Sequence, residues 1–478
     1  MAAETSETSE TTTLETTTAQ TVAELREAFD AGVTKSYEWR VTQLRSLRRM
    51  LVDNEAVLAG ALRDDLGKSA TESFITEIGF LVKEIDHTLK NLRRWLRPTS
   101  VRVPSWMLPA RAQLVREPLG VVLVIAPWNY PLLLSVSPLI GAVGAGNAVV
   151  VTPSEVAPAT SRALAQLVPA YLDPEAVRVV EGGIPETTAL LQQRFDHIFY
   201  TGNARVGRIV MTAAAAHLTP VTLELGGKSP TFVDEGVDLE VTARRIVWGK
   251  FTNAGQTCVA PDYLLGTRAV FDGLKPFLEK AIREFHGEQH PVPVDTYGRI
   301  VNDHHYARLD ALLDDDLIVT GGRRDASARY IEPTVLDRVP GDHPVMQEEI
   351  FGPILPLVEV SGVDDAIDFI NAREKPLALY VFTNRAQTKR RFIRDTSSGG
   401  INFNVPLAHL GAPGLPFGGV GASGMGKYHG EASIDVFTHT KSVLDKPTSP
   451  DTLSLIYPPF TGMKESVLRR VFAPRRRS

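Results

Sequence analysis

The chain has very little cysteine: Cys258 is the only one among 478 residues. A single cysteine cannot form an intramolecular disulfide, so a disulfide framework is excluded and a reducing compartment such as the cytoplasm is expected. A lone cysteine is either a small buried hydrophobic residue or a thiol kept for its reactivity, and taken alone the first is commoner. The rest of the sequence must decide between these interpretations.

The chain also lacks an excess of positive charge. Its 51 Lys and Arg residues are outnumbered by 56 Asp and Glu residues, which gives a net charge of -5 and argues against a nucleic-acid partner. Residues 1–19 are rich in Thr, Glu and Ser and contain no Lys or Arg. They lack the features of a signal peptide and are predicted to form a disordered tail.

Long uninterrupted hydrophobic runs are missing as well. The charge-free segment 119–154 is broken by prolines, glycines and asparagines, so it predicts strand VVLVIA, loop PWNYP, a short helix and strand AVVVTP rather than a membrane span. The C-terminal residues SVLRRVFAPRRRS predict a short amphipathic helix with a basic end. Peripheral membrane contact by one such helix is less expected than docking on protein.

Short apolar runs alternate with helical patterns along most of the chain. Residues 20–97 are predicted to be helical, with a stop at Gly67 and Lys68, and strand and helix patterns then alternate through 119–224 and again through 238–445. This alternation predicts an α/β fold with parallel sheets, in which ligands bind at the carboxyl ends of the strands. The length predicts more than one domain.

Four segments contain side chains suited to thiol chemistry. A thiol can act as a nucleophile, a carboxylate as a base, and a side-chain amide as a donor to a developing oxyanion. Each residue also has a structural interpretation, as a turn residue, an ion-pair partner or a solvated charge. The segments are PWNYP with Asn129, VTLELGGK with Glu224, NAGQTCVAP with Cys258, and EEIFGP with Glu349.

Taken together, the motifs resemble one family. PWNYP, TPSE, FYTGNARVG, LELGGK, NAGQTC, EEIFGP and LPFGGVGASGMGKYHG occur in the order found in the NAD(P)-dependent aldehyde dehydrogenase superfamily. FYTGN, CVAPDY, GASGMGKYHG and YPPF resemble its class 3-like branch. The resemblance runs from about residue 20 to residue 460 and favours the reactive-thiol interpretation of Cys258.

The resemblance implies an aldehyde dehydrogenase-like α/β fold with a Rossmann-like cofactor domain, an α/β catalytic domain and a bridging β element that pairs across a homodimer. The expected segments are 20–97 and 119–224 for the NAD-binding domain, 225–415 for the catalytic domain, 98–118 and 430–446 for the bridging element, and 447–478 for a C-terminal tail with a short amphipathic helix.

The resemblance also implies roles for three residues. Cys258 would attack an aldehyde to give a thiohemiacetal and then a thioester, while the Asn129 amide and the Cys258 backbone N–H stabilise the oxyanion. Glu224 would activate the water that hydrolyses the thioester, which favours a non-acylating enzyme that releases the carboxylic acid. The substrates of such relatives are medium or long aliphatic and aromatic aldehydes.

Further residues match cofactor and substrate positions of the family. Tyr130 is expected in the wall of the aldehyde tunnel, and Pro416 with Phe417 at its mouth. HLGAPGLPFGG is longer than the usual form and is expected to reshape the entrance. The expected cofactor-binding residues are Thr152, Glu155, Gly202, Gly207, Gly226, Gly227, Glu349 and Phe351.

One departure bears on the cofactor. Thr152 stands in TPSE where the family usually has a lysine that can meet a 2′-phosphate, so NAD is expected to be preferred over NADP. Two other interpretations stay open, namely a thiol esterase without cofactor and a catalytically silent scaffold. No metal site is predicted, because the pairs His286 with His290 and His304 with His305 lack the three or four ligands that zinc requires.

Overall fold

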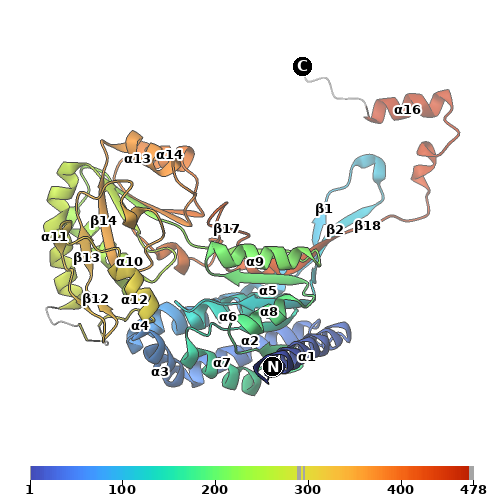
Figure 1. The fold of residues 1–478 in the computed structure, drawn as a ribbon. Helices are drawn as coiled ribbons and strands as arrows, with labels where there is room; N and C mark the ends of the chain where they lie inside the picture. Colours follow the sequence, from blue (N-terminus) through green and yellow to red (C-terminus); the bar gives the residue numbers. More distant parts are fainter. Residues whose placement is uncertain (1, 288–291, 294–295, 473–478) are drawn as a thin grey trace.

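A computed structural model describes residues 2–287, 292–293 and 296–472. It has two large sheets, each covered by helices, and a small sheet that projects from the body together with the C-terminal segment (Figure 1). The two large sheets are mainly parallel, which confirms the predicted α/β class. No helix in the described part of the chain has the length and apolar content needed to cross a bilayer.

The first large sheet has six strands in the order β17-β7-β6-β3-β4-β5, and all neighbours are parallel except β17 with β7. Its central strands are buried along their full length because helices cover both faces. The strands are β3 (Val121–Ile125), β4 (Ala148–Thr152), β5 (Val177–Val179), β6 (His197–Thr201), β7 (Val221–Glu224) and β17 (Gly424–Met425).

Helices from the N-terminal segment and from the crossovers cover this sheet. They are α1 (Ala2–Asp30), α2 (Tyr37–Asp53), α3 (Glu55–Leu66), α4 (Ala70–Ser73), the π-helical turn η1 (Phe74–Ile78), α5 (Gly79–Trp95), α6 (Pro131–Ala145), α7 (Pro158–Tyr171), α8 (Ile184–Leu191) and α9 (Ala204–Ala215).

The segment 1–19, predicted to be a disordered tail, is helical in the structure from Ala2, where α1 begins. Val22 and Leu25 of this helix are buried in a cluster with strand residues of the first sheet, and Thr18 is also buried. Extending a helix from a packed turn costs much less than nucleating one. The Thr- and Glu-rich composition therefore does not prevent the helix from continuing towards the N-terminus.

The second large sheet has the order β10-β13-β14-β9-β8-β15-β16, with only β10 antiparallel to its neighbour. Its strands are β8 (Pro230–Val233), β9 (Tyr263–Gly266), β10 (Ile318–Thr320), β13 (Thr334–Leu336), β14 (Ile354–Glu359), β15 (Ala378–Phe382) and β16 (Gly400–Phe403). Around it lie α10 (Leu239–Phe251), α11 (Arg268–His286), α12 (Asp303–Asp310), α13 (Val363–Asn371), α14 (Ala386–Asp395) and the hairpin of β11 (Arg324–Asp325) with β12 (Tyr330–Ile331).

The small antiparallel sheet has the order β1-β2-β18, formed by Thr99–Val101, Arg111–Pro118 and Thr438–Asp445. The segment 430–446, predicted to be a strand, begins instead with helix α15 (Glu431–Val436) before β18. So short a helix cannot be told from a strand by its periodicity. The chain continues into α16 (Gly462–Phe472), and the basic residues 473–478 lie outside the described part.

Candidate active site

Two of the predicted residues lie at or shortly after the carboxyl ends of parallel strands of the first sheet. Asn129 lies in the loop between β3 and α6, and Glu224 is the last residue of β7. Cys258 comes from the second large body, in the loop that connects α10 to β9. Asn129 and Glu224 therefore occupy the strand ends where ligands bind in such sheets, and Cys258 reaches them from the other body.

The loop before Cys258 has an unusual backbone. Asn253, Ala254 and Gly255 have positive φ angles of 54°, 51° and 75°, a conformation that costs a non-glycine residue about 1–3 kcal/mol. At Gly255 a Cβ atom would overlap the backbone oxygen of Gly352. Gln256 is fully buried, and its amide donates to the backbone oxygens of Asn253 at 3.1 Å and Arg299 at 2.9 Å.

Asn129 lies against this same loop. Its side chain is buried, and Nδ2 donates to the backbone oxygen of Gln256 at 3.1 Å. A primary amide carries two N–H groups, and this bond uses one of them. The neighbouring Tyr130 hydroxyl is 2.7 Å from Oγ1 of Thr257, directly before Cys258. With the bond from Asn253 Nδ2 to the Asn129 carbonyl at 2.8 Å, the PWNYP and NAGQTC loops are hydrogen-bonded to each other at three points.

The Cys258 thiol is half-buried and packs against the apolar cluster that contains Tyr380, Phe417 and Tyr428. Burial raises the pKa of this thiol above its usual value, and the nearby carboxylates of Glu349 and Glu224 raise it further. The backbone N–H groups of Cys258 and Val259 act in the opposite direction. The thiol therefore lies close to both carboxylates, and backbone donors face its sulfur.

Glu224 is buried, and neither carboxylate oxygen has a hydrogen-bond partner among the described residues. Burial raises the pKa of this carboxyl well above its usual value. An unpaired buried carboxylate is costly, so stability alone does not account for Glu224 at this position. Because its pKa is raised, this carboxyl holds a proton up to a higher pH than an exposed glutamate does.

Glu349 lies beside the glycine pair that follows β7. A Cβ atom at Gly226 would overlap the Glu349 carboxylate, and the Gly227 N–H hydrogen-bonds it. Burial, followed by Asp262, raises the pKa of Glu349 to about 8. Phe351 has a φ of 51° and its ring packs edge-on against Trp128 at 5.3 Å between centroids.

The remaining predicted cofactor residues lie at other strand ends of the first sheet. Thr152 ends β4 and is buried, whereas Glu155 is exposed three residues later. Gly202 follows β6 at a point where a Cβ atom would overlap the Tyr200 hydroxyl. Gly207 is buried in α9, and a Cβ there would lie 3.1 Å from the Leu225 side chain. These glycines allow α9 to approach the end of β7.

These features fit a ligand that carries sugar hydroxyls and phosphates. Glu349 Oε1 and Thr152 Oγ1 are buried without a hydrogen-bond partner among the described residues, and buried polar atoms are normally paired. The glycines at 202 and 226 let the Tyr200 hydroxyl and the Glu349 carboxylate lie against the backbone at these strand ends. A dinucleotide would supply hydroxyl partners, and the start of α9 would favour its phosphate charge.

The two predicted substrate residues, Tyr130 and Phe417, both lie near the Cys258 loop. Tyr130 is buried in the PWNYP loop, and Phe417 pairs with Tyr428 through an isolated antiparallel bridge. Phe417 also stacks on His429 with 5.6 Å between ring centroids. Both aromatic residues belong to the surroundings of the thiol, since Phe417 shares its apolar cluster and Tyr130 contacts Thr257.

The sequence did not single out several buried polar residues around the site. Lys68, predicted only as a helix stop, is fully buried and forms an ion pair with Glu77, which lies within a helical segment. Lys250 is also fully buried, without a hydrogen-bond partner among the described residues, and burial lowers its pKa to about 8. Charged residues in helical regions usually face solvent. The local sequence therefore does not predict that Lys68, Glu77 and Lys250 are buried.

Two histidines of the predicted pairs make ring contacts with aromatic residues. No group of three or more His, Cys, Asp or Glu residues in the described ranges could hold a metal ion. His286 packs against Tyr297, and His305 packs on Trp128 at 4.9 Å between ring centroids. His290 lies outside the described residues.

Comparison with known proteins gives the same assignment throughout. A family model described as "Aldehyde dehydrogenase family" matches residues 4–443. A rat protein named "Aldehyde dehydrogenase, dimeric NADP-preferring" is 50% identical over 426 residues, which cover 89% of this chain and 94% of the relative. Aldehyde dehydrogenase family 3 member H1 of Arabidopsis thaliana is 49% identical over 453 residues, 94% of this chain and 93% of the relative.

Solved structures agree with the sequence matches. A substrate-bound AldH from Staphylococcus aureus superposes with a TM-score of 0.92 at 45% identity, covering 95% of this chain and 99% of that one. The NAD-bound indole-3-acetaldehyde dehydrogenase of Pseudomonas syringae superposes with a TM-score of 0.82 at 26% identity, covering 91% and 89%. These matches confirm the predicted fold. The chain belongs to the aldehyde dehydrogenase family, and it is an NAD(P)-dependent enzyme that oxidises aldehydes to carboxylic acids.

Proposed function

We propose that Cys258 is the nucleophile, Asn129 the oxyanion donor and Glu224 the base of a non-acylating dehydrogenase for medium- or long-chain aliphatic or aromatic aldehydes. The observation that carries this proposal is the buried Glu224 carboxylate, unpaired among the described residues, close to the only thiol of the chain. The apolar residues around Cys258 support hydrophobic substrates. A panel of aldehydes compared by kcat/KM tests the substrate class.

In the first half-reaction the Cys258 thiolate forms a bond to the carbonyl carbon, and the carbonyl π electrons move onto oxygen. Asn129 Nδ2 and the Cys258 N–H donate hydrogen bonds to that oxyanion. When bound, the nicotinamide cofactor supplies the acceptor for the hydride that leaves this carbon. Collapse of the oxyanion then leaves a thioester on Cys258.

In the second half-reaction Glu224 takes a proton from water, whose oxygen bonds to the thioester carbon. The carbon–sulfur bond breaks, the carboxylic acid leaves and the thiolate is restored. The raised pKa of Glu224 makes its carboxylate a stronger base than that of an exposed glutamate, which suits it to this step.

We expect NAD to be preferred over NADP by about 10- to 100-fold in kcat/KM, the value of one hydrogen bond to a charged group. The reason is Thr152, which offers no positive charge to a 2′-phosphate, while Glu155 beside it is exposed and acidic. The names of the rat and dog relatives, "NADP-preferring", point in the other direction. Fluorescence titration of both cofactors, alongside kcat/KM, measures the preference directly.

Two substitutions of Thr152 test whether this residue alone sets the preference between NAD and NADP. Thr152→Lys should raise NADP affinity, whereas Thr152→Val, which keeps the shape and adds no charge, should leave the ratio unchanged. Equal kcat/KM for NAD and NADP in the unsubstituted enzyme would show that Thr152 does not set the preference.

We also propose that the enzyme is a homodimer held together by the small sheet. Strand β18 lies at the edge of this sheet, and Leu444 on it is 54% exposed. An unpaired strand edge pairs readily with another chain, and the rat relative is named dimeric. Light scattering should give twice the monomer mass, and Leu444→Lys should weaken the dimer at least tenfold. A monomer at micromolar concentration would reject the assignment.

A further inference from the structure

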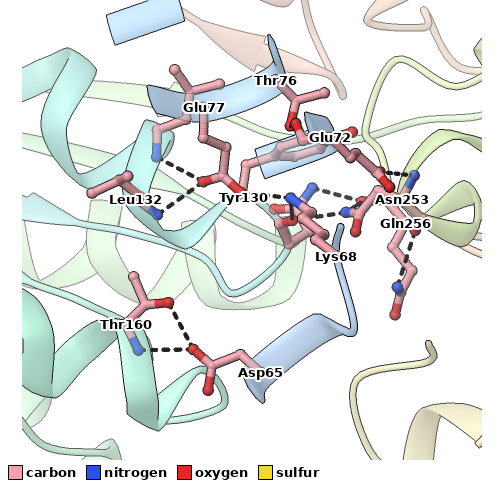
Figure 2. A network of polar contacts seen from close by, with 12 residues as sticks. Asp65, Lys68, Glu72, Thr76, Glu77, Tyr130, Leu132, Thr160, Asn253 and Gln256 are labelled. Atoms are coloured by element: carbon pink, nitrogen blue, oxygen red, sulfur yellow. Dashed lines mark hydrogen bonds and ion pairs between the residues drawn. The ribbon is translucent and has the colours of Figure 1, made fainter. Parts of the chain in front are cut away.

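A buried ion pair lies behind the PWNYP loop. Lys68 is in the turn after α3 and Glu77 is in η1; both side chains are fully buried, and Lys68 Nζ is 2.6 Å from Glu77 Oε1 (Figure 2). Desolvation offsets most of the attraction within such a pair, so a buried ion pair is weak evidence for a role in stability. The contacts of its two members indicate a different role.

Glu77 fixes the beginning of helix α6. Its second carboxylate oxygen accepts hydrogen bonds from the Leu132 N–H at 3.0 Å and the Leu133 N–H at 2.9 Å. The N-cap residue of α6, Tyr130, makes no side-chain cap of its own. Glu77 therefore satisfies the free N–H groups and matches the positive end of the helix dipole from another element. The Asn129 backbone immediately precedes Tyr130, the N-cap residue of this helix.

Lys68 fixes the Asn129 backbone itself. Its ammonium donates to the Asn129 carbonyl oxygen at 3.3 Å and lies 3.9 Å above the centroid of the Tyr130 ring. The same carbonyl accepts a second hydrogen bond from Asn253 Nδ2 at 2.8 Å. With its backbone held from two sides, Asn129 directs its own amide to the Gln256 carbonyl at 3.1 Å.

The segment that contains Lys68 and Glu77 also contacts the Cys258 loop. Glu72 of α4 accepts the backbone N–H of Asn253 at 2.7 Å, and Asn253 is one of the residues with positive φ. Asn253 Nδ2 also donates to the Gln256 carbonyl at 3.1 Å. Figure 2 shows these side chains converging between the two loops. One short segment, residues 67–78, thus holds both loops of the active site.

We propose that Lys68 and Glu77 are positioning residues that hold the Asn129 amide in register with the Cys258 loop. This inference rests on the proposed function, because it assumes that the Asn129 amide stabilises the oxyanion. Loss of either member should displace the amide and slow acylation by about 10- to 100-fold, since misplacing a catalytic group by about 1 Å costs about 100-fold. The reactivity of the thiol itself should change little.

The test compares acylation with thiol reactivity in the full-length enzyme. The variants are Lys68→Met and Glu77→Gln, which keep side-chain shape and remove one charge each, together with Asn129→Ala. Acylation is the pre-steady-state burst of reduced nicotinamide absorbance at saturating aldehyde and NAD. Thiol reactivity is the rate of iodoacetamide alkylation, which reports only Cys258 because the chain has no other cysteine.

Asp65→Asn is a matched control. Asp65 is a buried carboxylate at the end of α3, and it accepts a hydrogen bond from the Ala159 N–H at 2.9 Å. It accepts another from the Thr160 N–H at 2.8 Å (Figure 2). It therefore caps α7 much as Glu77 caps α6, at a different loop. We expect Asp65→Asn to leave the acylation rate within about threefold, while Glu77→Gln lowers it at least tenfold and both keep the alkylation rate.

The decisive result is the double variant Lys68→Met/Asn129→Ala. If Lys68 acts through Asn129, the double variant should acylate no more than about threefold slower than Asn129→Ala alone, because residues that act as a unit are not additive. If the double variant instead acylates more slowly by the product of the two single-variant losses in rate, the positioning role is wrong. Unchanged acylation in Asn129→Ala would instead reject the oxyanion assignment on which the inference rests. If Lys68→Met does not fold, Glu77→Gln in the Asn129→Ala background gives the same decision.

Discussion

Replacement of Cys258 by alanine should lower kcat for aldehyde oxidation by at least about 10⁴-fold, because removal of a covalent nucleophile leaves only binding and oxyanion stabilisation. The thiol is the only one in the chain, so no neighbouring cysteine can substitute for it. The measurement is the steady-state formation of reduced nicotinamide at saturating substrate. Full activity of the alanine variant would contradict the proposed mechanism.

The control for this variant must show that the site is still intact. Cys258 packs against an apolar cluster, and alanine removes only one sulfur from a half-buried position. We therefore expect the thermal midpoint to change by only a few degrees and the affinity for NAD to be kept within about threefold. Iodoacetamide should label the unsubstituted protein once and the alanine variant not at all.

The sequence predicted the parts of the site that follow regular strands. VVLVIA, AVVVTP and HIFYTG are short apolar runs because their strands are buried on both faces. The carboxyl ends of these strands meet at one edge of the sheet, so Asn129 and Thr152 could be placed there from the pattern alone. The pairing of that edge with the Cys258 loop came from the family resemblance and not from any periodicity.

The sequence could not predict the network behind the site. Lys68 and Glu77 are charged residues within a helical region, and the usual interpretation of such residues is a solvated face. Their burial depends on packing against the beginning of α6. This is a tertiary contact, since Glu77 and Leu132 are 55 positions apart in the chain. The strained backbone at Asn253 and Ala254 is equally invisible, since neither residue type requires a positive φ.

The site keeps two carboxyl groups, those of Glu224 and Glu349, in a poorly solvated environment. Burial raises the pKa of Glu224 and also that of Glu349, and both carboxylates oppose ionisation of Cys258. Two negative groups beside a thiol are costly unless they protonate or meet a ligand. This electrostatic arrangement favours the neutral thiol of Cys258 over the thiolate when no ligand is bound.

Replacement of Glu224 by glutamine should slow turnover by about 10²- to 10⁴-fold while leaving the first half-reaction intact, since a general base contributes about this much. The amide keeps the size of the carboxyl but cannot take a proton from water. A burst of one equivalent of reduced nicotinamide should therefore persist, and intact-protein mass spectrometry should find the acyl group on Cys258.

Glu84 provides the matched control for Glu224→Gln. It is another buried carboxyl, bonded to the Ser137 hydroxyl at 2.7 Å, and burial raises its pKa to about 7. Glu84→Gln should keep steady-state turnover within about threefold, because this residue has no role in the proposed reaction.

The pH dependence of deacylation is a second test of the role of Glu224. In the unsubstituted enzyme deacylation should speed up as pH rises through the raised pKa of Glu224, since only the ionised carboxylate accepts a proton. Glu224→Gln should flatten that rise, and an unchanged rate and profile would assign the base to another group.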